Sequence, residues 1–244
     1  MLIQTIPEIG STNTALLARL ADGQASGEGA WLITDRQSAG RGRAGRTWFG
    51  GAGNFMGSTV AWLVSGDPPA PTLALVAGVA VHRVVSALAP NARDLWLKWP
   101  NDLLVAGAKL GGILLERQGD AVVVGIGVNL AAAPDLPNRS STSLREIGVG
   151  IPRDAFAQAL AAQWASTLAS WHKRDWPALR DEWLARAHPL GTPLMVRDAG
   201  GQAIEGHFAG LEPHGAALLR LADGTARAIH AGEVEMVRDH AAGD

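Results

Sequence analysis

The chain has 244 residues, of which 47% are hydrophobic and 18% charged, and its net charge is −2 at neutral pH. This is the balance of a globular protein with one full core and a small second domain, and it argues against a general affinity for nucleic acid. Cysteine is absent, which excludes disulfides, thiolate metal sites and a cysteine nucleophile. Because the sequence shows neither a signal peptide nor an apolar run of membrane-spanning length, we expect a cytoplasmic protein without membrane contact.

Three polar residues, Ser11-Thr12-Asn13, precede a segment at 14–20 that has the apolar spacing of a short helix. Ser, Thr and Asn are preferred helix caps, so we expect one of them to cap this helix. Three in a row exceed what a cap requires. The surplus hydroxyl and amide groups either add capping bonds or hydrogen-bond a small polar ligand.

Arginine and glycine alternate in the stretch from Gln37 to Trp48. Residues 40–46 alone contain three glycines and three arginines. Glycine lets a ligand approach the backbone closely, and the arginine fork suits phosphate and carboxylate oxygens. We predict that this arginine loop (residues 40–48) wraps a polyphosphate or an acyl-phosphate while Trp48 offers an aromatic face to a base. The alternative is a solvated basic turn.

The same loop matches the dinucleotide-binding pattern G-x-G-x-x-G, which has meaning only between a strand and a helix. A strand is predicted before it, at 31–35. The segment 48–54 cannot start a helix, however, and the next predicted element is a strand at 55–64. A Rossmann loop places its phosphates at a helix N-terminus, so the sequence argues against a Rossmann fold.

The middle of the chain predicts a buried helix and a strand that ends in polar residues. The helix covers 72–88, is apolar on most faces and carries His82, which we interpret as structural. The strand at 95–99 must end at Pro100. It therefore delivers Lys98, Asn101 and Asp102 to its tip, where binding groups are commonly held. A plain lysine–carboxylate ion pair is the alternative.

A hairpin with its turn at 106–108 is predicted next, followed by a strand at 121–130. Lys109 begins the second strand of the hairpin, and the paired glycines 111–112 allow a ligand or another backbone to approach. Asn129 is the one polar side chain of the 121–130 strand. A buried asparagine needs partners, which belong either to the fold or to a ligand.

The last part of the chain predicts two helices and a small barrel. After a connection at 131–143, the helices occupy 153–187 and are split near 176–177. The four tryptophans 164, 171, 176 and 183 have near-heptad spacing and belong to the core. Residues 189–193 mark a boundary between domains 1–189 and 190–244. Beyond it, short alternating segments at 194–197, 203–211, 216–221, 226–231 and 234–237 predict a five-stranded barrel.

Together these stretches resemble the biotin protein ligases. Residues 40–48, 98–102, 109–114 and 125–130 occur in the family's order and spacing, and Ser11-Thr12-Asn13 and the terminal barrel match as well. The resemblance covers essentially the whole chain. It implies an α/β (α+β) fold, the class II aminoacyl-tRNA synthetase-like domain with a mixed sheet, plus an SH3-like barrel. It also implies the short form without an N-terminal helix-turn-helix domain, so no specific DNA binding is expected.

The resemblance implies a reaction in two steps. Biotin and ATP with Mg²⁺ give biotinyl-5′-adenylate and pyrophosphate, and a lysine of a biotin carboxyl carrier protein then takes the biotinyl group. Biotin's own carboxylate attacks the α-phosphate, so catalysis is mostly positioning and charge stabilisation. No protein side chain is identified as a metal ligand. Related ligases pair through strands of the central domain, so the resemblance allows a homodimer.

Residue roles follow from the same resemblance. The biotin-binding residues are Ser11, Thr12, Asn13, Gln37, Arg41, Gly42, Arg43 and Lys109. The ATP- and adenylate-binding residues are Arg41, Arg43, Arg46, Trp48, Lys98, Asn101, Asp102, Lys109 and Asn129. Lys109, Arg43 and Asp102 are the expected catalytic residues, with Asp102 orienting or deprotonating the acceptor amine. Residues 49–54 are richer in glycine than the family pattern leads us to expect.

Two alternatives belong to other classes. Lipoate ligases and octanoyltransferases share the implied fold, but the octanoyltransferases rely on a cysteine that this chain lacks. Neither group carries the Gly-Arg-Gly-Arg loop. A non-catalytic biotin-binding module would need no phosphate site, and the retained Lys98, Asp102 and Lys109 argue against it.

Overall fold

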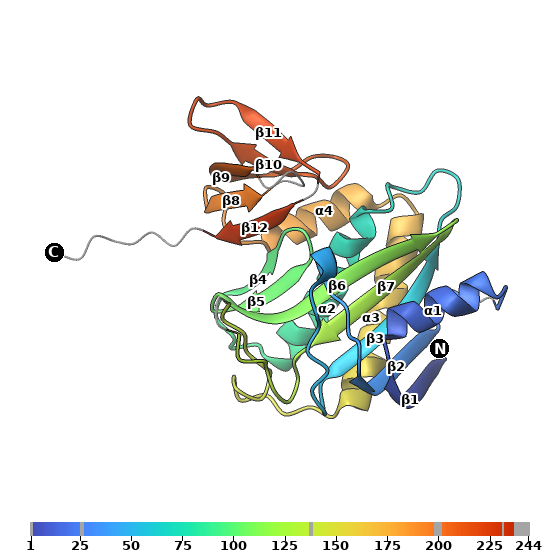
Figure 1. Ribbon diagram of the computed structural model, residues 1–244. Coiled ribbons are helices and arrows are strands. Elements are labelled where there is room, and N and C mark those ends of the chain that lie inside the picture. Colours follow the sequence, from blue (N-terminus) through green and yellow to red (C-terminus); the bar gives the residue numbers. More distant parts are fainter. Residues whose placement is uncertain (1, 25–26, 137–138, 198–201, 231, 237–244) are drawn as a thin grey trace.

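The computed structural model describes residues 2–24, 27–136, 139–197, 202–230 and 232–236 (Figure 1). Its central sheet is mixed and has the order β1-β2-β3-β7-β6-β5-β4. The strands are β1 (Ile3–Ile9), β2 (Trp31–Gln37), β3 (Phe55–Trp62), β4 (Leu95–Lys98), β5 (Asp102–Val105), β6 (Ala108–Gln118) and β7 (Ala121–Val128). The pair β1–β2 is parallel, and each later neighbouring pair is antiparallel.

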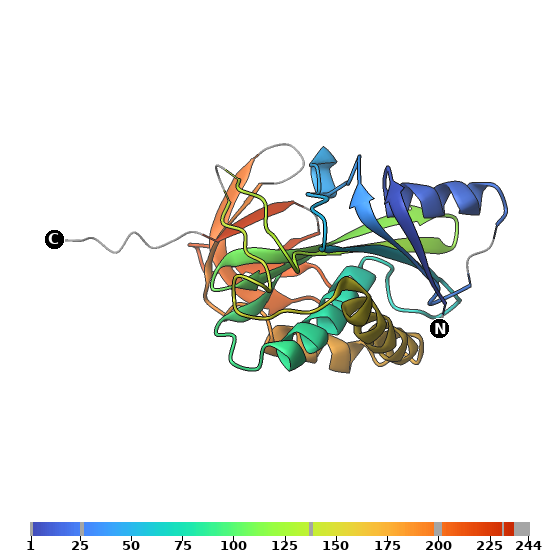
Figure 2. The ribbon, with the colours of Figure 1, turned by 90° about the horizontal axis from the view of Figure 1, so that it is seen from below.

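The helices cover the two faces of this sheet unequally (Figure 2). Helices α2 (Thr72–Leu88), α3 (Arg153–His172) and α4 (Trp176–Ala185) lie on one face and enclose the main core. The predicted bounds of α2 are confirmed, as is the split between α3 and α4. The short helix α1 (Thr12–Ala21) covers part of the other face, over a smaller apolar cluster.

Strand β7 shows why the second face is left partly open. Its side chains alternate between faces, so Val124 and Ile126 enter the main core while Val123 lies in the cluster under α1. The next two positions on the α1 side are Gly125 and Gly127. Next to the N-terminus of α1, β7 therefore has no side chains on the α1 face of the sheet at positions 125 and 127.

The arginine loop joins β2 to β3 without an intervening α-helix. It contains one short 3₁₀ turn at Arg43–Gly45, so the exclusion of a Rossmann fold is confirmed. The Gly42 amide donates to the Arg46 carbonyl at 2.7 Å, and the Trp48 amide donates to the Gly40 carbonyl at 2.9 Å. A β-carbon at Gly40 would lie 2.6 Å from the Trp48 carbonyl oxygen, so this close approach requires glycine.

The glycine-rich segment 49–54 ends in a buried anchor. Asn54 Oδ1 accepts from the backbone amides of Leu130, Ala131 and Ala132 at 3.0, 2.9 and 3.2 Å. Its Nδ2 donates to the Ala132 carbonyl at 2.7 Å. This side chain therefore fixes the beginning of the 131–143 connection against the sheet.

A second, antiparallel sheet contains the five strands predicted after residue 189. They are β8 (Pro193–Arg197), β9 (Ala203–Leu211), β10 (Ala217–Arg220), β11 (Ala226–Ile229) and β12 (Glu233–Met236), in the order β11-β10-β9-β8-β12. The predicted strand residues 231 and 237 lie outside the described part of the chain. The domain boundary at 189–190 stays a prediction.

Tryptophans join the two sheets. Trp99 Nε1 donates to the Gly215 carbonyl at 3.0 Å, and Trp176 Nε1 donates to the Pro213 carbonyl at 2.5 Å. The ring of Trp183 lies 6.5 Å from that of Phe208, and the main core continues across this contact. All four tryptophans predicted for the core are buried. Among the described residues, no helix is long and apolar enough to cross a membrane.

His188 lies where the chain passes from α4 to the second sheet. It is 1% exposed, and its ring lies 4.4 Å from that of Phe208. Burial lowers the pKa of His188 to about 4, and the positive charge of Lys98 acts in the same direction. In the unfolded chain the imidazole titrates near its ordinary pKa of 6.5.

Acid should therefore destabilise the protein through His188. The unfolded state gains a proton as pH falls below 6.5, while the folded state resists it down to about pH 4. This linkage removes about 2 kcal/mol of unfolding free energy between pH 7 and pH 5. Urea unfolding at both pH values, for the unsubstituted protein and for His188→Leu, measures it. An equal pH dependence in the two proteins would contradict this prediction.

Candidate active site

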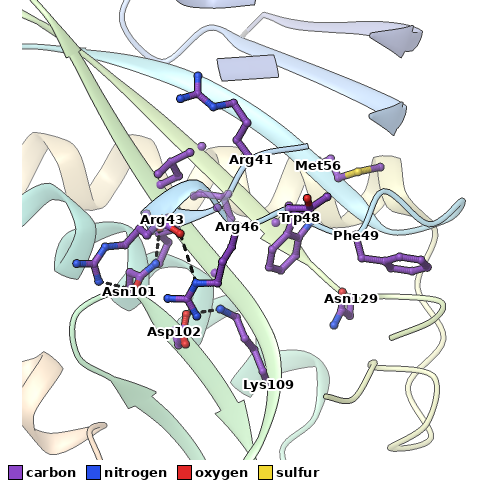
Figure 3. Close-up of a pocket in the computed structure, with 18 of the residues that line it drawn as sticks. Arg41, Arg43, Arg46, Trp48, Phe49, Met56, Asn101, Asp102, Lys109 and Asn129 are labelled. Atoms are coloured by element: carbon purple, nitrogen blue, oxygen red, sulfur yellow. Dashed lines mark hydrogen bonds and ion pairs between the residues drawn. The ribbon is translucent and has the colours of Figure 1, made fainter. Parts of the chain in front are cut away.

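A cavity of about 600 Å³ opens on the α1 side of the central sheet, beneath the arginine loop (Figure 3). It collects almost all the predicted site residues from separate parts of the chain. Those that line it are Ser11, Thr12, Asn13, Gln37, Arg41, Gly42, Arg43, Arg46, Trp48, Asn101, Asp102, Lys109 and Asn129. Lys98 is the exception.

The N-terminus of α1 forms an uncharged polar wall. Ser11 caps the helix by accepting from the Thr14 amide at 3.4 Å, as predicted. The Thr12 amide donates to Gln37 Oε1 at 2.8 Å, and the Thr12 hydroxyl oxygen lies 3.1 Å from the same Oε1. Ser11 therefore caps the helix, and Thr12 connects the polar wall to β2 through Gln37.

Asn13 contacts two residues, Ser58 and Glu116, whose place beside the site the sequence did not predict. Its Nδ2 donates to Glu116 Oε2 at 2.9 Å, and its Oδ1 accepts from Ser58 Oγ at 2.6 Å. Both partners lie on strands that are distant in sequence. The one local signal was a single charge at Glu116, which ends an otherwise apolar stretch of β6.

The opposite end of the cavity is cationic. Arg43 donates from Nη1 to Asn101 Oδ1 at 3.2 Å and from Nη2 to the Gly232 carbonyl of the second sheet at 3.4 Å. Asn101 is itself fixed, because its Nδ2 donates to the Ile113 carbonyl at 2.7 Å. Arg43 thus contacts two neutral acceptors, one between β4 and β5 and one directly before β12.

Lys109 and Asp102 form an ion pair at 2.5 Å on the cavity wall. The sequence offered a lysine–carboxylate pair for Lys98 in the 98–102 stretch, whereas the structure pairs Asp102 with Lys109. Figure 3 shows Arg46 directed toward this pair, while Arg41 points away from it.

Trp48 lies in a cradle made by glycines of neighbouring strands. Gly112 of β6 is paired with Gly127 of β7, and a β-carbon at Gly127 would come within 2.3 Å of the indole. Lys109 Nζ lies 5.7 Å from the centre of the Trp48 ring, within cation–π range. The missing side chains let the indole lie on the sheet.

Asn129 is held by the fold through one end of its amide, and its contact with a ligand stays a prediction. Its Nδ2 donates to the Thr142 carbonyl at 3.1 Å, so the fold holds the amide. Its Oδ1 is buried and, within the described parts of the chain, has no hydrogen-bond partner. An unsatisfied buried acceptor on a cavity wall is a position where a ligand donor gains energy.

Lys98 is not brought to the cavity. It pairs with Asp102 in the β4–β5 ladder, but its charge acts on His188 at the junction with the second sheet. Its role in nucleotide binding stays a prediction without support from the position of the side chain.

The charge balance of the lining predicts an anionic ligand. In the described part of the lining, five positive charges face the single carboxylate of Asp102. They belong to Arg41, Arg43, Arg46, Lys109 and Arg139. Among the residues that the structure describes, no group of three or more His, Asp or Glu side chains could hold a metal ion. The arrangement fits phosphate oxygens beside an uncharged polar group.

Comparison with known proteins gives the family. The pattern of the "Biotin/lipoate A/B protein ligase family" matches residues 6–130, and that of the "Biotin protein ligase C terminal domain" matches residues 190–237. A biotin–[acetyl-CoA-carboxylase] ligase of Paracoccus denitrificans is 39% identical over 86% of this chain and 90% of its own length. This chain belongs to the biotin protein ligase family.

Further relatives agree with this assignment. A biotin–[acetyl-CoA-carboxylase] ligase of Mycobacterium tuberculosis is 35% identical over 97% of this ligase and 89% of its own length. The biotin protein ligase of Aquifex aeolicus, solved in complex with biotin and ATP, has a TM-score of 0.83 at 25% identity. That match covers 97% of this chain and 99% of the other. The fold class expected from the sequence is confirmed.

The glycine cradle can be tested with a matched pair of substitutions. A β-carbon at Gly127 would overlap the indole at 2.3 Å, whereas one at Gly112 would stand 3.3 Å from it. Because stacking of a base on an aromatic ring is worth about 1–3 kcal/mol, Gly127→Ala should raise the ligase's KM for ATP by about tenfold. Gly112→Ala should change it much less. Equal effects of the two substitutions in steady-state assays would count against the cradle.

Proposed function

We propose that this chain activates biotin with ATP to biotinyl-5′-AMP and then transfers the biotinyl group to a lysine of a biotin carboxyl carrier protein. The observation that carries the proposal is a single cavity with an uncharged hydrogen-bonding wall at one end and a cationic end beside Trp48. A ureido ring has N–H donors and a carbonyl acceptor that such a wall can pair. The dithiolane ring of lipoate offers neither, which disfavours a lipoate ligase.

In the first step, the ureido ring is held by the wall at Ser11, Thr12, Asn13 and Gln37, with the carboxylate directed toward Lys109. A carboxylate oxygen attacks the α-phosphorus, the bond to the β-phosphate oxygen breaks, and pyrophosphate leaves with the electron pair. Arg43 exchanges its neutral acceptors, Asn101 Oδ1 and the Gly232 carbonyl, for phosphate oxygens. The guanidinium is charged in both arrangements, but an anionic phosphate oxygen adds a charge–charge attraction that a neutral carbonyl oxygen does not supply, so this exchange is favourable.

The adenosine is placed by the remaining groups. Trp48 packs beside the adenine, and the buried Asn129 Oδ1 accepts from a donor such as the exocyclic amine. Arg41 and Gly42 belong to the part of the loop that closes over biotin, and Arg46 contacts phosphates. Magnesium enters with ATP as part of the substrate, since Mg²⁺ is typically held by substrate phosphates and water with few protein carboxylates.

In the second step, the acceptor amine attacks the acyl carbon of the adenylate, an amide forms and AMP leaves. The free amine has a pKa of about 10.4, so it must lose a proton near neutral pH. Among the described residues that line the cavity, Asp102 alone carries a carboxylate. We assign it to orient the amine and accept its proton.

The wider setting follows from the same proposal. The acceptor is the carrier domain of acetyl-CoA carboxylase, the protein named for the P. denitrificans and M. tuberculosis relatives. The ligase acts in the cytoplasm, and its net charge of −2 supports the absence of specific DNA binding. A homodimer through strands of the central domain would use one of its two edge strands, β1 or β4.

Pyrophosphate release tests the first step. With ATP and magnesium, biotin should support release, whereas lipoate and octanoate should not. Arg43→Gln should lower kcat/KM by about a hundredfold, because a charge-stabilising donor is lost. Arg36→Gln, at an exposed arginine of β2 paired with Glu8 at 3.7 Å, is the matched control and should leave the rate unchanged. Release with lipoate alone, or tight biotin binding without release, would refute the proposal.

The transfer step can be isolated with preformed biotinyl-5′-AMP and the carrier protein. Asp102→Asn keeps the shape of the side chain and removes the base, so single-turnover transfer should slow by at least about a hundredfold. A higher pH should recover part of the rate by supplying free amine. An unchanged transfer rate in the variant would remove Asp102 from this role.

A further inference from the structure

Glu116 of β6 does not line the cavity, yet it contacts two of the residues that do. Its Oε2 accepts from Asn13 Nδ2 at 2.9 Å, and its Oε1 pairs with Arg41 Nη1 at 3.1 Å. The carboxylate therefore joins the start of α1 to the arginine loop, with one oxygen for each. Its side chain is only 19% exposed, so the contacts are partly shielded from water.

This carboxylate fixes the orientation of the Asn13 amide. A carboxylate that pairs with arginine accepts hydrogen bonds and donates none, so Asn13 must present its NH₂ group to Glu116. The Leu114 carbonyl accepts from the same Nδ2 at the longer distance of 3.4 Å and favours the same orientation. The amide oxygen is thereby directed to Ser58 Oγ at 2.6 Å. The Asn13 oxygen lies directly against the backbone of Gly125, where a β-carbon would be only 2.2 Å from it.

The orientation of Asn13 then determines the hydroxyl protons beyond it. Ser58 Oγ lies 2.6 Å from Asn13 Oδ1 and 2.7 Å from Thr12 Oγ1. Since Asn13 Oδ1 carries no proton, Ser58 supplies its own to that contact. Ser58 then has no second proton for Thr12 Oγ1 at 2.7 Å, so the single proton of the Thr12 hydroxyl serves this contact in place of the 3.1 Å contact with Gln37 Oε1. Gln37 Oε1 keeps the Thr12 amide as donor at 2.8 Å. One carboxylate sets the donor and acceptor pattern along the polar wall.

We propose that Glu116 is a positioning residue that imposes this pattern on the biotin-binding wall and couples the wall to the arginine loop through Arg41. The inference rests on the proposed function, because it concerns the same wall. Glu116 itself does not contact the substrate. Its substitution changes biotin affinity and the link to the loop, while the fold is retained.

Glu116→Gln is the informative variant. The amide keeps the size of the side chain, loses the charge that holds Arg41, and has an NH₂ group that lets the Asn13 amide turn over. We expect the Kd for biotin, measured by calorimetry without ATP, to rise about tenfold, as befits a lost hydrogen bond to a charged group. Glu116→Asp keeps an acceptor-only carboxylate and should recover part of this affinity.

Glu182→Gln supplies the matched control. Glu182 is also 19% exposed and pairs with Arg83 at 2.6 Å, but on the helical side of the sheet, away from the cavity. Its substitution should lower the thermal midpoint without changing the Kd for biotin. If the Kd for biotin of Glu116→Gln is no higher than that of the Glu182→Gln control, the proposal is overturned.

The link to the loop is measured by a double-mutant cycle with Arg41→Gln. If Glu116 acts partly through Arg41, the double variant should bind biotin less weakly than the product of the two single effects. If the effects of the two substitutions on the free energy of biotin binding simply add, Glu116 and Arg41 are not coupled. The same series measures biotin binding by the unsubstituted protein. If that protein does not bind biotin, the proposed function and this inference are both refuted. If it binds biotin and Glu116→Gln binds equally well, only the role of Glu116 is refuted.

Discussion

Five positive side chains surround one cavity whose wall has a single carboxylate, and the arrangement of the site depends on how those charges are held. Like charges about 4 Å apart repel by about 4 kcal/mol near a protein surface, so each cation needs a partner while the cavity is open. Arg41 pairs with Glu116, Lys109 pairs with Asp102, and Arg43 donates to the neutral oxygens of Asn101 and Gly232. Phosphate oxygens would add negative charge that the two neutral oxygens do not supply, so the cluster of cations favours a polyanion.

Room for the ligand comes from positions without side chains. Gly125 makes space for the Asn13 amide, and Gly127 with Gly112 makes space for the Trp48 indole. The other side of β7 is continuous core, so the same strand supports the helices and opens the cavity. The second sheet is tied to the first and to the arginine loop, because the Gly232 carbonyl accepts from Arg43 and the turn at 213–215 accepts from Trp99 and Trp176.

The sequence predicted the parts of the site whose signals are local. Alternating glycine and arginine, and polar residues after a strand that must end at proline, are unusual enough to be read without a fold. Glu116 and Ser58 were missed because their meaning arises from pairing with Asn13, which lies 103 and 45 residues away from them. Lys98 was placed at the cavity with Asn101 and Asp102, but the chain reverses between them at Trp99–Pro100, and Lys98 instead acts on His188. These placements depend on the order of the strands and on the direction of hydrogen bonds, which only the three-dimensional structure shows.

The central claim is that the cavity makes and retains biotinyl-5′-AMP. Rapid gel filtration after mixing the protein with biotin and ATP, labelled in parallel at the α- or the γ-phosphate, tests it directly. The account predicts that α-label stays with the protein in about equimolar amount, that γ-label does not, and that the carrier protein discharges the retained label. Equal retention of both labels, or no retention of α-label in the presence of biotin, would contradict it.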